Sequence, residues 1–148
     1  MTKILVIHGA GMNMRGKLMV ELFGPMSLAD YDRLIREYAS EVGVEIETFQ
    51  SNIVGEVINR IYAAHDGDID AMVINPAGYM TGHPALAGAI SSVRFPSVEV
   101  HVTNPANRGV TSEIAPACRG VVTGLGIFGY NLALRAAASL LQKGGSGS

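Results

Sequence analysis

The amino-acid sequence predicts an α/β fold in which one parallel β-sheet lies between layers of helices. Five short segments, each apolar or alternating in polarity, are separated by segments with helical periodicity, and this alternation is typical of parallel sheets. Residues 3–9 and 71–75 are almost continuously apolar, as expected of strands buried on both faces. These two strands are therefore expected at the centre of the sheet.

Length and composition indicate one domain with a substantial core. The chain has 148 residues, of which 48% are hydrophobic and 16% charged, so it does not have the composition of a disordered protein. A net charge of −2 without a basic run argues against binding to nucleic acid or anionic membranes. The single cysteine, Cys118, excludes an intrachain disulfide and a cysteine zinc cluster. We assign residues 1–143 to the domain and the Gly/Ser segment 144–148 to a linker or tag remnant.

Neither a signal peptide nor a membrane span is predicted. The apolar run at 4–7 is too short for a signal sequence and leads directly into His8. No apolar run approaches the roughly 20 residues that cross a bilayer. We therefore expect a cytoplasmic location.

The first strand, 3–9, leads into a long connection and then a helix. Residues 10–25 contain several glycines and methionines without regular periodicity, which is typical of a binding loop or lid. Helical spacing of apolar residues predicts a helix over 28–42, with Ser27 as N-cap and Gly43 as its C-terminal stop.

The second strand, 44–50, is expected at an edge of the sheet, because polar residues alternate with its apolar ones. A second helix follows, capped by Ser51 or Asn52, and it ends at residues 66–68. The third strand, 71–75, is ended by a proline and a glycine.

The second half of the chain continues the alternation. Its final helix is apolar over most of its length, so we expect it to be covered on more than one side and to make subunit contacts. The predicted elements are a helix at 84–93, a strand at 97–104, a long connection at 105–116, a strand at 120–125 and a helix at 128–142.

Five strands with helical crossovers favour a flavodoxin-like three-layer sandwich with a five-stranded parallel sheet in the order 2-1-3-4-5. Ligands of such sheets bind beyond the carboxyl ends of the strands, where the chain order reverses. In this sequence that crevice is expected between residues 8–13 and 75–83, with 101–104 next to them.

Glu99 and His101 form the candidate acid–base pair. Successive side chains of a strand point to opposite faces, so these two residues share a face. A carboxylate beside an imidazole orients the ring and stabilises imidazolium, which suits a general acid. A satisfied polar patch at a strand end is the alternative, and the residues alone do not decide between the two.

Other polar residues near the crevice leave their roles open. The amide of Asn75 can hold a substrate hydroxyl or satisfy turn backbone groups, and Tyr79 can offer a phenol or make a structural hydrogen bond. In the two long loops, several charged residues are candidates for contacting an anionic ligand or closing a lid. They are Arg15, Lys17, Arg108 and Glu113, and the alternative is that they are ordinary surface charges, which we favour for Lys17.

No cofactor and no metal are predicted. Gly9 and Gly11 begin a dinucleotide fingerprint, but Met14 stands at its last glycine position, which argues against a nicotinamide or flavin site. His8, His83 and His101 fall at the same sheet edge without a known metal-ligand spacing.

The sequence resembles type II 3-dehydroquinate dehydratases (type II dehydroquinases) over essentially all of residues 3–142. The matching residues are Lys3–Ile7, Gly9, Asn13, Gly16, Phe49–Asn52, Gly55, Glu56, Ile74–Ala77, Tyr79, Val98–His101, Asn104, Gly120–Val122, Gly124–Gly126, Gly129, Tyr130 and Leu132–Arg135. The resemblance implies a homologue of shikimate/quinate pathway enzymes, with a small-molecule substrate, no cofactor, and trimers assembled into a dodecamer.

The resemblance also implies roles for individual residues. The family removes water from a cyclic 3-keto acid through an enolate. A lid tyrosine is the base, helped by a lid arginine, and a first-loop asparagine holds an enolate-stabilising water. His101, backed by Glu99, matches the group that protonates the departing hydroxyl. Asn75 and the backbone of Val102 and Thr103 match substrate-binding groups.

The lid departs from the family pattern. Family members usually read Gly-x-Arg-Glu-Pro-x-x-Tyr-Gly where this chain has residues 16–24, so the arginine falls on Leu18 and the tyrosine on Phe23. The first-loop asparagine falls on Gly11. The histidine expected after the third strand falls on Thr81, with His83 nearby. Arg108 matches a different arginine from the one that binds the substrate carboxylate.

These departures lead to two hypotheses. The first is a diverged dehydratase or lyase that acts on a small hydroxy or keto compound, with 3-dehydroquinate dehydration weak or lost, because Phe23 has no ionisable proton. His101 is then the proton donor or acid–base residue, and the candidates for a new base are Glu21, His8, His83 and Tyr79. The candidate substrate-binding residues are Asn75, Val102, Thr103, Asn13, Tyr79, Thr81, His83, Phe23 and Arg108. The second hypothesis is a catalytically inactive homologue that serves as a metabolite-binding or assembly protein.

Overall fold

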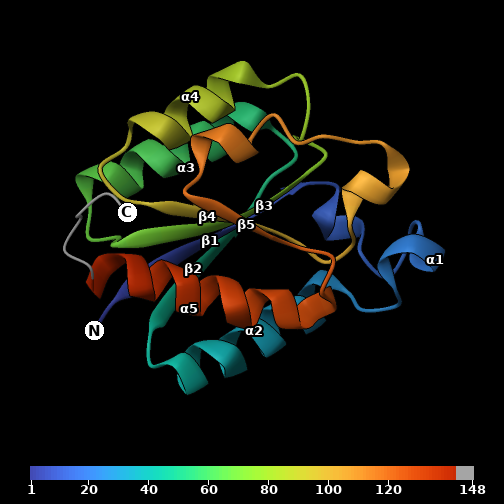
Figure 1. The fold of residues 1–148 in the computed structure, drawn as a ribbon, viewed down its shortest axis with the longest axis horizontal. Helices are drawn as coiled ribbons and strands as arrows, with labels where there is room; N and C mark the ends of the chain where they lie inside the picture. The colour runs from blue at the N-terminus through green and yellow to red at the C-terminus, as the bar shows by residue number, and fades with distance from the viewer. Residues whose placement is uncertain (143–148) are drawn as a thin grey trace.

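The computed structural model describes residues 1–142, in which a five-stranded parallel sheet has the order β2-β1-β3-β4-β5. The predicted fold class and strand order are confirmed. Helices α2 and α5 cover one face of the sheet and α3 and α4 cover the other (Figure 1). The strands are β1 (Lys3–Ala10), β2 (Glu45–Gln50), β3 (Ala71–Ala77), β4 (Ser97–His101) and β5 (Gly120–Thr123), and the helices are α1 (Val20–Phe23), α2 (Leu28–Val42), α3 (Val54–Asp66), α4 (Pro84–Ser92) and α5 (Gly129–Gln142).

Alternate side chains of the central strands pack into two separate hydrophobic cores, one on each face of the sheet. In β1, Ile4 and Val6 pack against α2 and α5, whereas Leu5 and Ile7 pack against α3 and α4. All four side chains are fully buried. This two-sided burial explains why β1 reads as a continuous apolar run, and it leaves only the strand ends free for polar groups.

Helix α2 has the predicted bounds because both of its ends are chemically determined. The Ser27 hydroxyl accepts a hydrogen bond from the Asp30 N–H, and the Asp30 carboxylate accepts one from the Ser27 N–H, which forms a capping box. Gly43 ends the helix with a φ of 85°, in the left-handed region that favours glycine.

Several predicted boundaries were wrong, and among them β5 ends at Thr123, two residues earlier than predicted. The N-cap of α3 is Ile53 and not Ser51 or Asn52, because the Ser51 hydroxyl instead accepts from the Ile53 N–H (3.0 Å) and donates to Glu56 (2.5 Å). Strand β3 continues to Ala77, through the proline expected to end it. Strand β4 ends at His101, three residues earlier than predicted, and a 3₁₀ turn begins at Pro105.

The first long connection is more ordered than predicted. It contains a 3₁₀ turn at Met12–Met14 and the short helix α1, which projects from the body of the molecule (Figure 1). Gly16 is required here, since its φ is 81° and a Cβ would lie 2.8 Å from the Pro25 carbonyl oxygen. This turn brings residues 16–24, which we call the lid segment, over the carboxyl ends of the strands.

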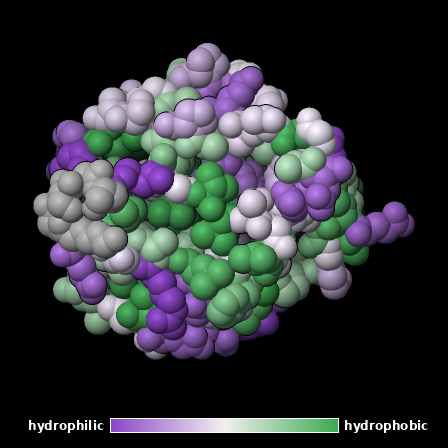
Figure 2. Space-filling model, viewed as in Figure 1, coloured by the Kyte–Doolittle hydropathy of each residue, from purple (hydrophilic) through white to green (hydrophobic). Residues whose placement is uncertain are grey.

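Apolar side chains remain exposed at the β5 edge. Val121, Leu125 and Phe128 are about half exposed. Figure 2 shows hydrophobic side chains gathered in the centre of the face that is viewed in Figure 1. No helix within residues 1–142 is long and apolar enough to cross a membrane. Subunit contacts, the cytoplasmic location and the single-domain assignment remain predictions, and the 144–148 segment lies outside the described residues.

Candidate active site

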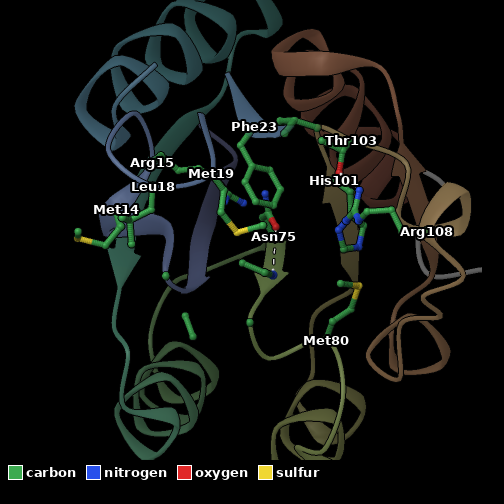
Figure 3. A pocket seen from close by; sticks show the side chains of 15 residues that line it. Met14, Arg15, Leu18, Met19, Phe23, Asn75, Met80, His101, Thr103 and Arg108 are labelled. Atoms are coloured by element: carbon green, nitrogen blue, oxygen red, sulfur yellow. Dashed lines mark hydrogen bonds between the residues drawn. The ribbon is translucent and has the colours of Figure 1, made fainter. Parts of the chain in front are cut away.

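A pocket of about 340 Å³ opens at the carboxyl ends of β3 and β4, beneath the lid segment. Its wall is apolar on the lid side and polar around the strand ends (Figure 3). The large apolar side chains are Met14, Leu18, Met19, Phe23 and Met80. The polar and charged side chains are Arg15, Asn75, His101, Thr103 and Arg108. The pocket occupies the crevice expected from the strand order.

His101 closes β4 and turns one ring edge to Glu99 and the other toward the pocket. Its Nε2 is hydrogen-bonded to Oε2 of Glu99, which leaves Nδ1 for a ligand. Glu99 is completely buried, and its Oε1 has no hydrogen-bond partner within residues 1–142. A buried carboxylate with one bonded oxygen orients the imidazole.

The Cys118 thiol lies near this pair. Burial raises the pKa of the nearby Cys118 thiol to about 12, and the charge of Glu99 adds to the rise. The thiol is therefore protonated at neutral pH, and Cys118 is unsuited to act as a nucleophile.

Asn75 lies at the floor of the pocket with its amide already oriented. Its side-chain N–H donates to the Tyr130 hydroxyl (3.1 Å), and its carbonyl oxygen accepts from the Ala77 N–H (3.2 Å). Tyr130 is fully buried, and this burial raises its pKa. An amide nitrogen carries two hydrogens, so one remains to donate to a substrate oxygen. Both sequence interpretations of Asn75 are thus compatible with its geometry.

The turn after β4 supplies the opposite wall. The carbonyl oxygens of His101 and Val102 accept from Gly124 (3.2 Å) and Gly126 (2.9 Å), which fixes the chain beyond the strand. Arg108 donates to the Thr103 hydroxyl (3.1 Å) from an exposed position at the mouth of the pocket. Val102, Thr103 and Arg108 therefore line the pocket, and their role in substrate binding stays a prediction.

The four candidate bases lie outside the pocket lining. Glu21 is exposed on α1. His8 is buried, and its Nε2 bonds Asp32 of α2 at 2.7 Å. The Tyr79 hydroxyl donates to the Ser51 carbonyl oxygen (2.8 Å), and the Tyr79 ring packs edge-on against His83.

Two further candidate residues also stand outside the lining. The Asn13 side-chain oxygen accepts a hydrogen bond from the Asn52 side-chain N–H (3.1 Å). The Asn52 side-chain oxygen in turn accepts one from the Gly11 backbone N–H (2.8 Å). Asn52 therefore holds the first loop in place. Thr81 is exposed.

Arg15, one of the four loop charges that the sequence analysis named for contacting an anionic ligand or closing a lid, lines the pocket. It directly follows the 3₁₀ turn, is only 8% exposed, and its guanidinium carbon lies 3.6 Å above the centre of the Phe23 ring. Its place in the first long loop was the only available signal, and the same loop holds the exposed Lys17.

The ionisable side chains of the lining are His101, Arg15 and Arg108. Of these, only histidine changes protonation between pH 5 and 8 in its ordinary range, so the lining offers one acid–base group. Residues 1–142 contain no group of three His, Cys, Asp or Glu side chains placed to hold a metal ion.

The chain is similar to known proteins both in sequence and in fold. The family model for "Dehydroquinase class II" matches residues 2–138. A 3-dehydroquinate dehydratase of Desulforudis audaxviator is 42% identical over 145 residues, covering 96% of each chain, and one of Clostridium acetobutylicum is 39% identical over 144 residues, covering 95% of this chain and 99% of its own. The crystal structure of type II dehydroquinase from Butyrivibrio crossotus superimposes with a TM-score of 0.88 at 31% identity, covering 93% of this chain and 97% of its own. The crystal structure of a 3-dehydroquinate dehydratase-like protein from Bifidobacterium longum superimposes with a TM-score of 0.74 at 30% identity, covering 96% of this chain and 99% of its own.

Proposed function

The chain belongs to the class II dehydroquinase family, and we propose that it is a diverged dehydratase of this family in which His101 is the acid–base residue. The observation that carries the proposal is the pocket lining, where His101, oriented by the buried Glu99, is the one side chain of a type that commonly acts as general acid and base. Relatives named 3-dehydroquinate dehydratase support the dehydratase class.

One histidine can serve both proton transfers if the substrate presents the proton and the hydroxyl on the same face. Neutral His101 takes the proton α to a carbonyl at Nδ1, and the C–H electron pair becomes an enolate. The imidazolium that forms is stabilised by Glu99. The enolate then expels the β-hydroxyl as its C–O bond breaks, and His101 returns the proton to that oxygen, so water leaves. The free N–H of Asn75 is available to the enolate oxygen.

The lid segment determines which substrate fits. Leu18, Met19 and Phe23 present apolar surface where a polyhydroxylated ring needs hydrogen-bonding partners. We propose a small hydroxy or keto compound that is more apolar than 3-dehydroquinate, and weak or absent turnover of 3-dehydroquinate itself. Phe23 has no ionisable proton and cannot replace a tyrosine base.

The test is turnover of a panel of hydroxy and keto acids, with 3-dehydroquinate included, by the parent, His101→Ala and the control His83→Ala. We expect His101→Ala to lose about 10²- to 10⁴-fold in rate, as is usual for a general acid–base group, and His83→Ala to keep most of it. Full activity of His101→Ala contradicts the assigned role. Robust turnover of 3-dehydroquinate by the parent contradicts the divergence.

A catalytically inactive, metabolite-binding or assembly protein is the second candidate, supported by the lack of a separate base in the lining. Ligand binding without turnover of any panel member favours it.

We also propose that the chain forms a homo-oligomer, a trimer-based dodecamer. The exposed Val121, Leu125 and Phe128 at the β5 edge support a subunit contact there. The molar mass in solution, measured by light scattering, tests this proposal, and a monomer contradicts it.

A further inference from the structure

Arg15 is a buried cation without a carboxylate partner. Only 8% of its surface is exposed, and no Asp or Glu oxygen within residues 1–142 lies within ion-pair distance of it. Its Nε is buried with no hydrogen-bond partner. Burying a charge without a counter-charge is costly, and folded proteins almost always pair such groups. A charge left unpaired at the wall of a pocket therefore points to a ligand that completes it.

The neighbours of Arg15 hold the guanidinium in place without neutralising it. The ring of Phe23 stacks on it at 3.6 Å. On another side lies Tyr31, whose pKa is raised by burial, while the positive charge of Arg15 and a hydrogen bond with it oppose that rise. Aromatic faces and a phenol orient a guanidinium, but they leave most of its five N–H donors free.

Figure 3 shows Arg15, Phe23 and Asn75 on one side of the pocket and His101, Thr103 and Arg108 on the other. From this arrangement we propose that Arg15 is the binding site for the carboxylate of the substrate, which places the reacting carbon atoms toward His101. The substrate class is then a monocarboxylate with its keto or hydroxy group at the end remote from the carboxylate. This orientation rests on the proposed function, whereas carboxylate binding by Arg15 does not.

Two guanidinium groups line the pocket, and the geometry distinguishes them. Arg108 is exposed and already donates to Thr103, so water screens its charge. Arg15 is shielded from water, and an anion beside it meets a less screened charge. Arg108→Met is thus the matched control for Arg15→Met.

The experiment measures binding of 3-oxocyclohexanecarboxylate and of its neutral methyl ester by calorimetry, in anion-poor buffer. All variants carry His101→Asn, which removes turnover and makes the result independent of the proposed reaction. We expect the acid to bind at least 10-fold more tightly than the ester, and Arg15→Met to abolish that preference, a loss of about 10- to 100-fold for a charge-assisted contact. Arg108→Met is expected to change the preference less than threefold.

Thermal melting supplies the second readout. Because Arg15→Met removes an uncompensated buried charge, it is expected to melt no lower than its parent in anion-free buffer, and the acid is expected to stabilise only the parent. Equal binding of acid and ester by the parent, an acid preference that survives Arg15→Met, or a preference that disappears in Arg108→Met overturns the proposal.

Discussion

Phe23→Tyr places a phenol in the lid at the position where the family resemblance puts the base. The Phe23 ring is half-buried, lines the pocket and lies 3.6 Å from the guanidinium carbon of Arg15. The added hydroxyl projects from a ring already in contact with the pocket, so we expect a change in unfolding free energy within about 1 kcal/mol. The substitution therefore tests chemistry with little structural cost.

The expected size of the effect follows from the nearby charge. A phenolate and a guanidinium about 5 Å apart attract by roughly 3 kcal/mol at an effective dielectric of about 20. Solvent reaches part of this ring, so we take about half of that value, which lowers the phenol pKa by about one unit from its ordinary value of about 10. The ionised fraction at pH 7 then rises from about 0.1% to about 1%.

The assay follows enone formation from 3-dehydroquinate by absorbance between pH 6 and 10. We expect Phe23→Tyr to exceed the parent by about 10-fold or more, with a rate that rises up to about pH 9. A cation favours the deprotonated phenol, so the double variant Phe23→Tyr/Arg15→Met is expected to need about one pH unit more to reach the same fraction of its maximum. No gain in rate, or a profile that Arg15→Met does not move, refutes this reasoning provided the melting temperature is parental.

Three other predictions follow from the described contacts. Glu99→Gln removes the charge behind His101 and is expected to lower turnover about 10²-fold or more while leaving ligand affinity within about threefold, as measured by steady-state kinetics and calorimetry. Ser27→Ala removes the capping box of α2 and is expected to cost about 1 kcal/mol in urea unfolding, and an unchanged midpoint contradicts that role. Because burial raises the pKa of Cys118 to about 12, we expect iodoacetamide at pH 8 to alkylate the native protein at least about 10²-fold more slowly than the urea-unfolded chain, with the rate rising as pH increases toward 12.

The fold could be predicted because local chemistry and the global pattern agree. Ser27 and Gly43 determine the ends of α2 by hydrogen bonding and backbone conformation, both of which act within a few residues. The continuous apolar run of β1 reflects burial on both faces, which determines its central place. The predicted N-cap of α3 was wrong because the Ser51 hydroxyl bonds two local partners, the Ile53 N–H and the Glu56 carboxylate. A sequence pattern does not show which partner such a hydroxyl takes.

The site was less predictable because its groups meet through long-range contacts. His8 lies at the correct edge, but a bond to Asp32, which is 24 residues away, holds it beside α2 and away from the pocket lining. Arg15 and Lys17 are two residues apart in one loop, yet only Arg15 turns inward, where it stacks on the face of the Phe23 ring. A loop without periodicity carries no information about such directions.

The two halves of the site differ in how much a substitution costs in stability. Glu99 is completely buried and bonded to His101, so truncating it leaves a cavity and an unpaired ring nitrogen in the sheet. Leu18 and Met19 are more than half exposed on the lid segment, where most exchanges change stability by less than about 0.5 kcal/mol. The lid can therefore take on new chemistry at little structural cost, while the β4 pair keeps its geometry. Substrate choice in this chain is accordingly expected to follow from Arg15, Leu18 and Phe23, and the proton chemistry from Glu99 and His101.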